Sequence, residues 1–238
     1  MTFLNTVTIV ASPRARAGKT LLARLLVDYH RQESRAFQAF DLNTGEDSLA
    51  QFLPGEVTVA GVANVQSQMA LFDSLVSADD VAKIVDVGHE GFESFFGLAQ
   101  KIGFFDEARK RSIAPVILFM ISADRASTDA YASLRRRFPG ATLAPVHNEM
   151  LGPGQYRDKY PVSGAGAALV RFPALAPGLR KFIEKPPFSF SDRDLANAKS
   201  IPLDVHIELQ RWLRKMHIEF RELDLRVLLA DLQSSLRL

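Results

Sequence analysis

Short apolar runs alternate along the chain with amphipathic stretches. The first run, Thr6–Ala11, is apolar and β-branched, which is typical of a strand buried on both faces. The stretch 19–29 then places four leucines at the spacing of one helical face. The same pattern predicts further strands over 35–41, 82–86, 116–121, 141–147 and 167–172. It predicts further helices over 64–77, 90–111 with a break near Gly103, 127–138 and 203–238.

This alternation predicts an α/β fold, with a mostly parallel central sheet and helices on both of its faces. We expect one domain over residues 1–185, followed by a helical C-terminal extension over 186–238 that packs on it. In the helix 64–77, one face should carry Val65, Met69, Phe72 and Val76. The last segment is either one long helix or a helix pair. Its apolar stripe, which we expect to pack on the sheet or on a partner subunit, consists of Leu209, Trp212, Leu213, Met216, Phe220, Leu223 and Val227.

Composition narrows the functional classes. Of the 238 residues, 47% are hydrophobic and 24% are charged, which excludes wholesale disorder. The chain contains no cysteine, so a disulfide scaffold, an iron–sulfur centre and a thiolate zinc site are excluded. Lys and Arg total 29 against 27 Asp and Glu, which does not favour polyanion binding by the whole chain. No apolar run is long enough to span a bilayer and no signal-peptide pattern opens the chain, so we expect a cytoplasmic protein.

The loop after the first strand ends in Gly18-Lys19-Thr20, directly before the first amphipathic helix. A strand, this tripeptide and a helix form the context of a phosphate-binding loop, because N–H groups at a helix N-terminus favour anions. Lys19 would reach the β- and γ-phosphates of a nucleotide, and the Thr20 hydroxyl would be a ligand of Mg²⁺. The alternative is an ordinary turn in which Lys19 is solvated and Thr20 caps the helix.

The loop departs from the standard pattern at three positions. Pro13 stands where the first glycine is required, and proline has a fixed φ and no N–H. Ala15 and Arg16 stand where related loops often carry glycine, and neither readily adopts a positive φ. We therefore expect a distorted loop with weakened affinity for nucleotides.

The chain resembles the ParA/MinD group of P-loop ATPases, whose loop usually reads G-K-G-G-x-G-K-[ST]. Aligned on Gly18-Lys19-Thr20, Arg14 takes the place of the signature lysine of that family. The resemblance implies that Arg14 contributes to catalysis by reaching the nucleotide of a partner subunit. Arginine keeps the charge and adds a planar fork suited to phosphate. The alternative is an exposed arginine on a surface loop.

Two more segments are similar to motifs of this family. The second strand ends in Asp41-Leu42-Asn43, which resembles a switch I segment ending in D-x-D. The resemblance implies a catalytic role for Asp41, whereas Asn43 replaces the second aspartate and cannot act as a base. The third predicted strand ends in Asp86-Val87-Gly88, which resembles a Walker B and switch II segment. There, Asp86 would orient Mg²⁺ and the Gly88 N–H would face the γ-phosphate; the alternative is that Asp86 caps the next helix.

A fourth and weaker match to the family is Asn148, which follows the strand predicted over 141–147. The resemblance implies that Asn148 contacts the adenine edge, although asparagine is also common in turns. The matches together imply a P-loop NTPase-type three-layer sandwich. They cover roughly residues 5–150. Their predicted positions after successive strands all lie at the carboxyl edge of one sheet, where open α/β folds bind ligands.

The resemblance implies a function as an ATP- and Mg²⁺-binding switch and weak ATPase. Nucleotide would control homodimerisation and the binding of DNA or a protein partner, as in partition or positioning of cargo. One alternative is a degenerate member of the family that acts as a non-hydrolysing binding or scaffolding module. Another is a small-molecule kinase or ligase-like enzyme with the glycine-rich stretch 151–156 as a lid.

Three further features have a functional and a structural interpretation. His89 follows the Asp86 motif and is either close to the γ-phosphate or simply solvated. The basic clusters 109–111 and 135–137 each end a predicted helix, where the dipole favours cations, but they could also contact DNA phosphates. Basic and acidic residues balance over 203–238, which argues against docking on a membrane surface.

Overall fold

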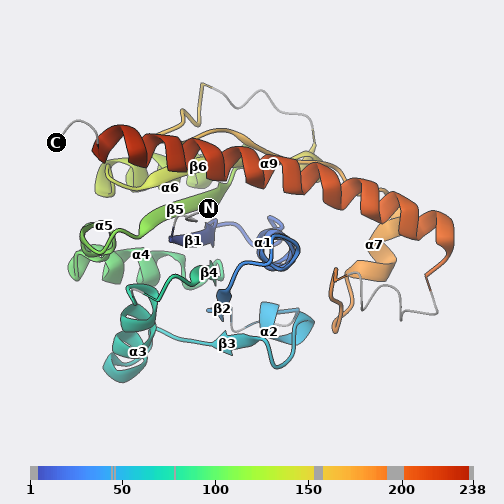
Figure 1. Cartoon of the computed structure of the whole chain (residues 1–238), viewed down its shortest axis with the longest axis horizontal. Coiled ribbons are helices and arrows are strands. Elements are labelled where there is room, and N and C mark those ends of the chain that lie inside the picture. Colours follow the sequence, from blue (N-terminus) through green and yellow to red (C-terminus); the bar gives the residue numbers. More distant parts are fainter. Residues whose placement is uncertain are drawn as a thin grey trace.

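Within the part of the chain that the structure describes, seven parallel strands form one sheet through the middle of the molecule (Figure 1). The computed structural model describes residues 5–235 apart from 44, 46, 78, 153–157 and 192–200. Across the sheet the strands are β3 (Val57–Val59), β2 (Phe37–Asp41), β4 (Ala82–Asp86), β1 (Thr6–Ala11), β5 (Ala114–Met120), β6 (Thr142–Asn148) and β7 (Val170–Phe172). Because neighbouring strands are parallel, all of them end at the same edge.

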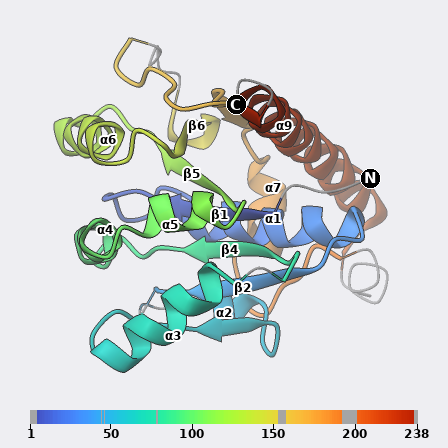
Figure 2. The same cartoon turned by 60° about the vertical axis from the view of Figure 1, so that its left-hand side comes forward.

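Helices cover both faces of the sheet and give the fold three layers (Figure 2). One layer contains α1 (Lys19–Gln32), α2 (Leu49–Phe52), α7 (Pro177–Ile183) and α9 (Leu203–Ser235). The other contains α3 (Val65–Leu75), α4 (Phe92–Lys101), α5 (Phe104–Lys110) and α6 (Arg125–Arg137). A short 3₁₀ helix, η1 (Glu149–Leu151), follows β6. The predicted α/β architecture is confirmed, and it is consistent with a P-loop-type three-layer sandwich.

The central strands have two buried faces, which explains their nearly unbroken apolar sequences. Successive side chains of β1 point to opposite sides: Val10 joins the core beneath α1, whereas Ile9 joins the core beneath α4 and α5. The second core is rich in phenylalanine, and the rings of Phe92 and Phe96 lie 4.9 Å apart. Both cores hold β1 in place, so the loop that follows it starts from a fixed point.

Four details differ from the sequence-based expectation or refine it. The pattern did not predict β3 or α7, because each has few residues and little apolar periodicity. The zone 90–111 divides at Gly103, whose φ of 66° ends the first helix. The last segment is one 33-residue helix, α9, rather than a pair. The expected face of α3 was half right: Phe72 and Val76 are buried, whereas Val65 and Met69 are 68% and 61% exposed because the helix turns Leu71 and Leu75 toward the core instead.

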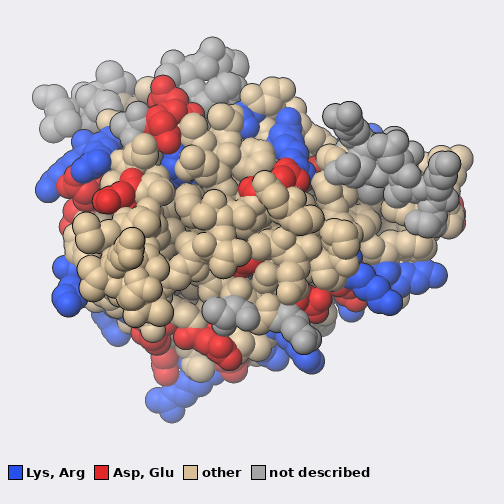
Figure 3. Space-filling view, turned by 90° about the horizontal axis from the view of Figure 1, so that it is seen from below, with Lys and Arg blue, Asp and Glu red and all other residues tan. Residues whose placement is uncertain are grey.

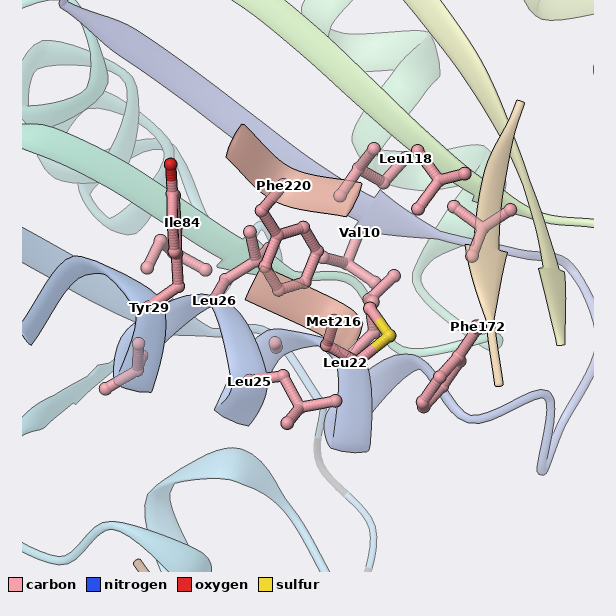
Figure 4. Close-up of a cluster of buried hydrophobic side chains, with 14 of the residues drawn as sticks. Val10, Leu22, Leu25, Leu26, Tyr29, Ile84, Leu118, Phe172, Met216 and Phe220 are labelled. Atoms are coloured by element: carbon pink, nitrogen blue, oxygen red, sulfur yellow. The ribbon is translucent and has the colours of Figure 1, made fainter. Parts of the chain in front are cut away.

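The long helix α9 packs against α1 and β7 (Figure 1). Its predicted apolar stripe is buried: Met216 and Phe220 extend toward Leu22, Leu26 and Val10 in one continuous core (Figure 4). Tyr29 of α1 donates a 2.9 Å hydrogen bond to Asp224, and Nε2 of His217 lies 3.2 Å from Oδ2 of Asp28. The helix that starts at the candidate phosphate loop is thus bound along its length to α9.

The two edges of the sheet are protected differently. At one edge, α9 packs against β7, whereas β3 forms the other edge and packs against α2. Uncharged residues cover most of the middle of the face seen from below, and charged residues lie mainly toward its margins (Figure 3). Val59 of β3 and Val65 and Met69 of α3 are exposed apolar side chains.

Candidate functional site

The predicted site residues on β1, β2 and β4 come together at the carboxyl edge of the sheet. The strand register pairs Asp41 of β2 with Asp86 of β4, and Asp86 with Val10 of β1. β1 ends at Ala11, one residue after Val10, and the loop 12–18 leads from there into α1. The carboxylates and the loop are therefore neighbours in space although they are far apart in the sequence.

The N-cap of α1 is Gly18. Gly18 has a φ of 95° and precedes the helix, and no described side chain caps this end. A Cβ at Gly18 would lie 2.8 Å from Nδ2 of Asn148, so this position requires glycine for its conformation and for space. The N–H groups of a first helical turn have no partner within the helix, and together with the helix dipole they favour an anion.

The loop adopts a turn without the standard glycines. Arg16 takes the left-handed conformation with a φ of 54°, although arginine adopts it at a cost of about 1–2 kcal/mol. Its side chain is exposed, whereas Ala17 is buried. The backbone N–H of Arg14 donates to Oγ of Ser12 at 3.2 Å, which stabilises the turn after Pro13. The expected distortion therefore takes the form of backbone strain at Arg16.

Lys19 is not a solvated side chain: it is only 8% exposed. Its Nζ donates a 2.8 Å hydrogen bond to the carbonyl oxygen of Arg14, so the side chain folds back across its own loop. Burial lowers the pKa of Lys19, and the nearby carboxylate of Asp86 opposes this shift. An ammonium group is thus held beside the helix N-terminus.

Thr20 and Asp86 form the closest side-chain pair of the site. Oγ1 of Thr20 donates a 2.7 Å hydrogen bond to Oδ2 of Asp86, so Thr20 does not cap α1. Asp86 is fully buried, and its Oδ1 has no hydrogen-bond donor among the described residues. Burial raises the pKa of Asp86 to about 7, although the Thr20 hydrogen bond lowers it. Asp86 does not cap α4 either, because the N-cap of that helix is Gly91.

Asp41 holds the loop that follows β2. Its Oδ1 accepts a hydrogen bond from the N–H of Asn43 at 2.9 Å, and its Oδ2 accepts one from the N–H of Ala50 at 2.8 Å. The residue is only 1% exposed. Both oxygens thus stabilise the backbone between β2 and α2, which gives Asp41 a structural role in this conformation. Thr44 and Glu46 in this loop lie outside the described residues.

The loops after β2 and β4 touch each other at Gly88. A Cβ at this glycine would lie 3.1 Å from Oδ1 and 3.2 Å from Cα of Asn43. Only a residue without a side chain allows so close an approach without displacing Asn43. A movement of one of these loops would therefore displace the other.

Arg14 lies at the rim of the site rather than inside it. Its side chain is 51% exposed, and Nη1 is 3.4 Å from Oδ2 of Asp124. Asp124 caps α6 by accepting a 2.8 Å hydrogen bond from the N–H of Ser127, and it also accepts one from the hydroxyl of Ser122. The Ser122 hydrogen bond is the main cause of the lowered pKa of Asp124. Sequence reasoning missed Asp124, although an aspartate directly before a helical segment is an N-cap signal.

Asn148 supports the loop instead of facing an open pocket. Its Nδ2 donates a 3.0 Å hydrogen bond to the carbonyl oxygen of Ala17, and its Oδ1 accepts one from the N–H of Met150. The side chain is 3% exposed. The predicted contact with adenine would have to break these hydrogen bonds, so the geometry favours a role in positioning the backbone before α1.

The other candidates lie apart from this centre. His89 is exposed in the turn after β4. The basic clusters end α5 and α6, shortly before β5 and β6 begin, so they lie toward the opposite edge of the sheet. Several of these side chains are engaged: Arg111 with Glu107, Arg109 with the Gly140 carbonyl and Arg137 with Gln100. Residues 153–156 of the expected lid, 151–156, lie outside the described residues.

The donor set fits a magnesium nucleotide better than a metal ion alone. Among the described residues, no three His, Asp or Glu side chains form a cluster that could hold a metal ion. Mg²⁺ usually keeps several waters and binds one or two protein oxygens together with substrate phosphates. The Thr20 hydroxyl and the unsatisfied oxygen of Asp86 provide such ligands next to the uncapped helix N-terminus.

None of the described helices is both long and apolar enough to cross a membrane.

Comparison with known proteins does not assign the chain to a family. The sequence matches no protein-family model, and no curated protein is significantly similar to it.

Proposed function

We propose that the chain binds ATP with Mg²⁺ at the loop before α1 and acts as a nucleotide-dependent switch of the ParA/MinD kind. The observation that carries this proposal is the convergence of Lys19, Thr20 and Asp86 at an uncapped helix N-terminus. Lys19 and Asp86 are buried, so the site already contains the opposite charges that a phosphate and a divalent cation require.

Each residue has a defined part in binding. The N–H groups at the start of α1 bind the phosphates. Lys19 exchanges its hydrogen bond to the Arg14 carbonyl for one to a phosphate oxygen. Thr20 and Asp86 hold Mg²⁺, which supplies charge neutralisation between the phosphates. Gly88 and Asn43 lie where their loops can respond to the γ-phosphate, because these loops are already in contact.

The output of the switch is the pairing of two subunits. In this proposal they close face to face over the nucleotides, and Arg14 leaves Asp124 to reach the nucleotide of the partner. The exposed position of Arg14 at the rim supports such a movement. The homodimer then binds DNA or a protein partner and serves in partition or positioning of cargo; this last step rests on the resemblance alone.

Calorimetric titration with ATP, ADP and GTP in the presence of Mg²⁺ tests the proposal. We expect the unmodified chain to bind ATP, and Lys19→Ala to raise the dissociation constant by more than about tenfold, or 1.4 kcal/mol. Lys101→Ala is the matched control, because it removes a positive charge from the exposed end of α4. Unchanged affinity in Lys19→Ala, or no binding by the unmodified chain, would contradict the assignment.

A second candidate function is a binding module that retains ATP without hydrolysing it. It is supported by the loop after β2, where both oxygens of Asp41 are used by the backbone and Asn43 replaces a carboxylate. Turnover at the background rate together with measurable ATP binding would favour this module over the ATPase. Asn43→Asp would then test whether the missing carboxylate limits hydrolysis.

A further inference from the structure

A cleft of about 630 Å³ opens between β7, α9 and the chain that precedes β7. This volume lies within the range of pockets that bind small molecules. The walls of the cleft come from Ile121 after β5, from the segments 160–162 and 167–169, and from four charged residues of β7 and α9. None of the residues placed at the candidate nucleotide site lines it, so the cleft requires an explanation of its own.

The uncharged wall of the cleft offers apolar surface to a ligand. Tyr160 is only 2% exposed, and its hydroxyl group donates a 2.5 Å hydrogen bond to the carbonyl oxygen of Ser122. Its ring packs nearly perpendicular to that of Tyr131, with 5.1 Å between the ring centroids. Val162 remains 50% exposed, and Leu169 is only partly buried. An apolar group in the cleft would remove these side chains from water, which favours its binding.

The cleft is preformed, because the loop between its two lining segments is anchored on both sides. Ser163 exchanges two backbone hydrogen bonds with Leu143 of β6. A Cβ at Gly166 would lie 2.6 Å from Cα of Val227, so this glycine allows the same loop to approach α9 closely. A pocket whose walls are already fixed binds a ligand with a smaller loss of conformational entropy.

Two of the four charged side chains of the cleft neutralise each other. Nη2 of Arg226 lies 2.7 Å from Oε1 of Glu222, one turn earlier on α9, and Nε of Arg226 donates to the same oxygen at 3.0 Å. Arg171 and Glu219 behave differently. The backbone N–H of Arg171 donates a 2.9 Å hydrogen bond to Oε2 of Glu219, yet neither side chain forms an ion pair within the described part of the chain. A cation and a carboxylate thus line the same cleft without being paired.

We propose that the cleft binds a small zwitterion with an apolar side chain, which is the chemistry of an apolar α-amino acid or of a short apolar peptide. The carboxylate of the ligand binds the guanidinium group of Arg171, whose planar fork matches two carboxylate oxygens. The ammonium group of the ligand binds the second oxygen of Glu219. The apolar side chain lies on Tyr160 and Leu169, and water fills the remaining space.

The charge balance of the cleft favours a ligand that carries both charges. Two arginines and two glutamates line it, so a ligand without net charge is the best complement. An anion without an ammonium group would pair with Arg171 but would be repelled by the carboxylate of Glu219. A cation without a carboxylate would pair with Glu219 and would leave Arg171 without a partner.

Calorimetric titration of the full chain with phenylalanine tests the proposal. We expect saturable binding of phenylalanine. The dissociation constant should be about tenfold higher or more for phenethylamine, which lacks the carboxylate, and for 3-phenylpropionate, which lacks the ammonium group. Tighter binding of diphenylalanine would identify a short peptide as the better occupant, and tighter binding of phenylalanine would identify the free amino acid. Absence of binding by both, or equal affinity for phenylalanine and its two analogues, would overturn the proposal.

Two variants that remove one charge each locate the ligand in the cleft. Arg171→Gln should weaken phenylalanine binding about tenfold or more, but it should not weaken the binding of phenethylamine. Glu219→Gln retains an oxygen that can accept the hydrogen bond from the Arg171 N–H. It should weaken phenylalanine binding to a similar extent, but it should not weaken the binding of 3-phenylpropionate. A purely structural role of either residue would weaken all of these ligands together.

Arg211→Gln and Glu208→Gln are the matched controls, because both residues are exposed on α9 and neither lines the cleft. Both controls should bind phenylalanine like the unmodified chain. If Arg171→Gln and Glu219→Gln bound it as tightly as the controls, the ligand would lie elsewhere and the proposal would be wrong. The titrations contain no nucleotide, so their outcome is independent of the proposed ATP site.

Discussion

Oγ1 of Thr20 and Oδ2 of Asp86 lie 2.7 Å apart, and their hydrogen bond joins the first turn of α1 to the end of β4. It supplies the buried carboxylate with one donor, while the second oxygen remains unsatisfied among the described residues. A cation between the two side chains would replace this hydrogen bond with stronger ligation and would relieve the cost of burying the charge. The pair is therefore the best place to detect magnesium nucleotide.

The first prediction concerns stability and pH. Burial raises the pKa of Asp86 to about 7, from an ordinary value near 4, so between these values the folded chain holds a proton that the unfolded chain has lost. The protonated carboxyl group of Asp86 therefore stabilises the folded chain in full below about pH 4, and this stabilisation is lost as the pH rises through about 7. Asp86→Asn should remove this pH dependence. Chemical denaturation of the variant and of the unmodified chain at several pH values measures the difference between their free energies of unfolding.

In Asp86→Asn, the amide oxygen can still accept the Thr20 hydrogen bond without a buried charge. The variant should therefore gain stability relative to the unmodified chain as the pH rises toward 8, by a few kcal/mol at most. It should at the same time lose the Mg²⁺-dependent part of ATP affinity. A difference in stability that does not change with pH would show that Asp86 titrates elsewhere.

The second prediction concerns the strained backbone of the loop. Arg16 has a φ of 54°, and glycine adopts this conformation without the steric cost that arginine incurs. After allowing for the greater entropy of glycine in the unfolded chain, Arg16→Gly should raise the free energy of unfolding by about 0.5–1 kcal/mol. Arg16→Ala is the control, because it removes the charge and keeps the strain. Equal stabilisation by both variants would locate the effect in the charge instead.

The sequence predicted the parts of the fold that depend on strong periodicity. The strands that carry Val10 and Asp86, and the helix that carries Leu22, were identified because their apolar residues follow one clear pattern. The three-residue strand β3 and the N-terminal half of the buried face of α3 were not, because packing against neighbouring elements decides them. Motif spacing brought Lys19, Thr20 and Asp86 together correctly. It could not show that Asn148 points into the loop, which depends on the contact between residues 131 positions apart.

The third prediction concerns Asp41. Its two oxygens accept backbone hydrogen bonds from Asn43 and Ala50, so Asp41→Ala leaves two N–H groups without their acceptor. We expect a loss of about 1–3 kcal/mol per group that stays buried. Asp41→Asn keeps one carbonyl oxygen and should lose less. Thermal unfolding measures both. If Asp41→Ala retained full stability and lost only hydrolysis, Asp41 would be catalytic rather than structural.

The last prediction separates two roles of Asn148. Its Nδ2 donates to the Ala17 carbonyl and its Oδ1 accepts from the Met150 N–H, so the amide supports the backbone directly before Gly18. Asn148→Ala should destabilise the chain by about 1–3 kcal/mol, because both partners lose a hydrogen bond in a buried place. In the proposed function the loop binds phosphates, so affinity for ATP and GTP should fall by the same factor, as measured by calorimetry. A residue that reads adenine would behave differently: its removal would weaken ATP binding alone and bring the two affinities closer together.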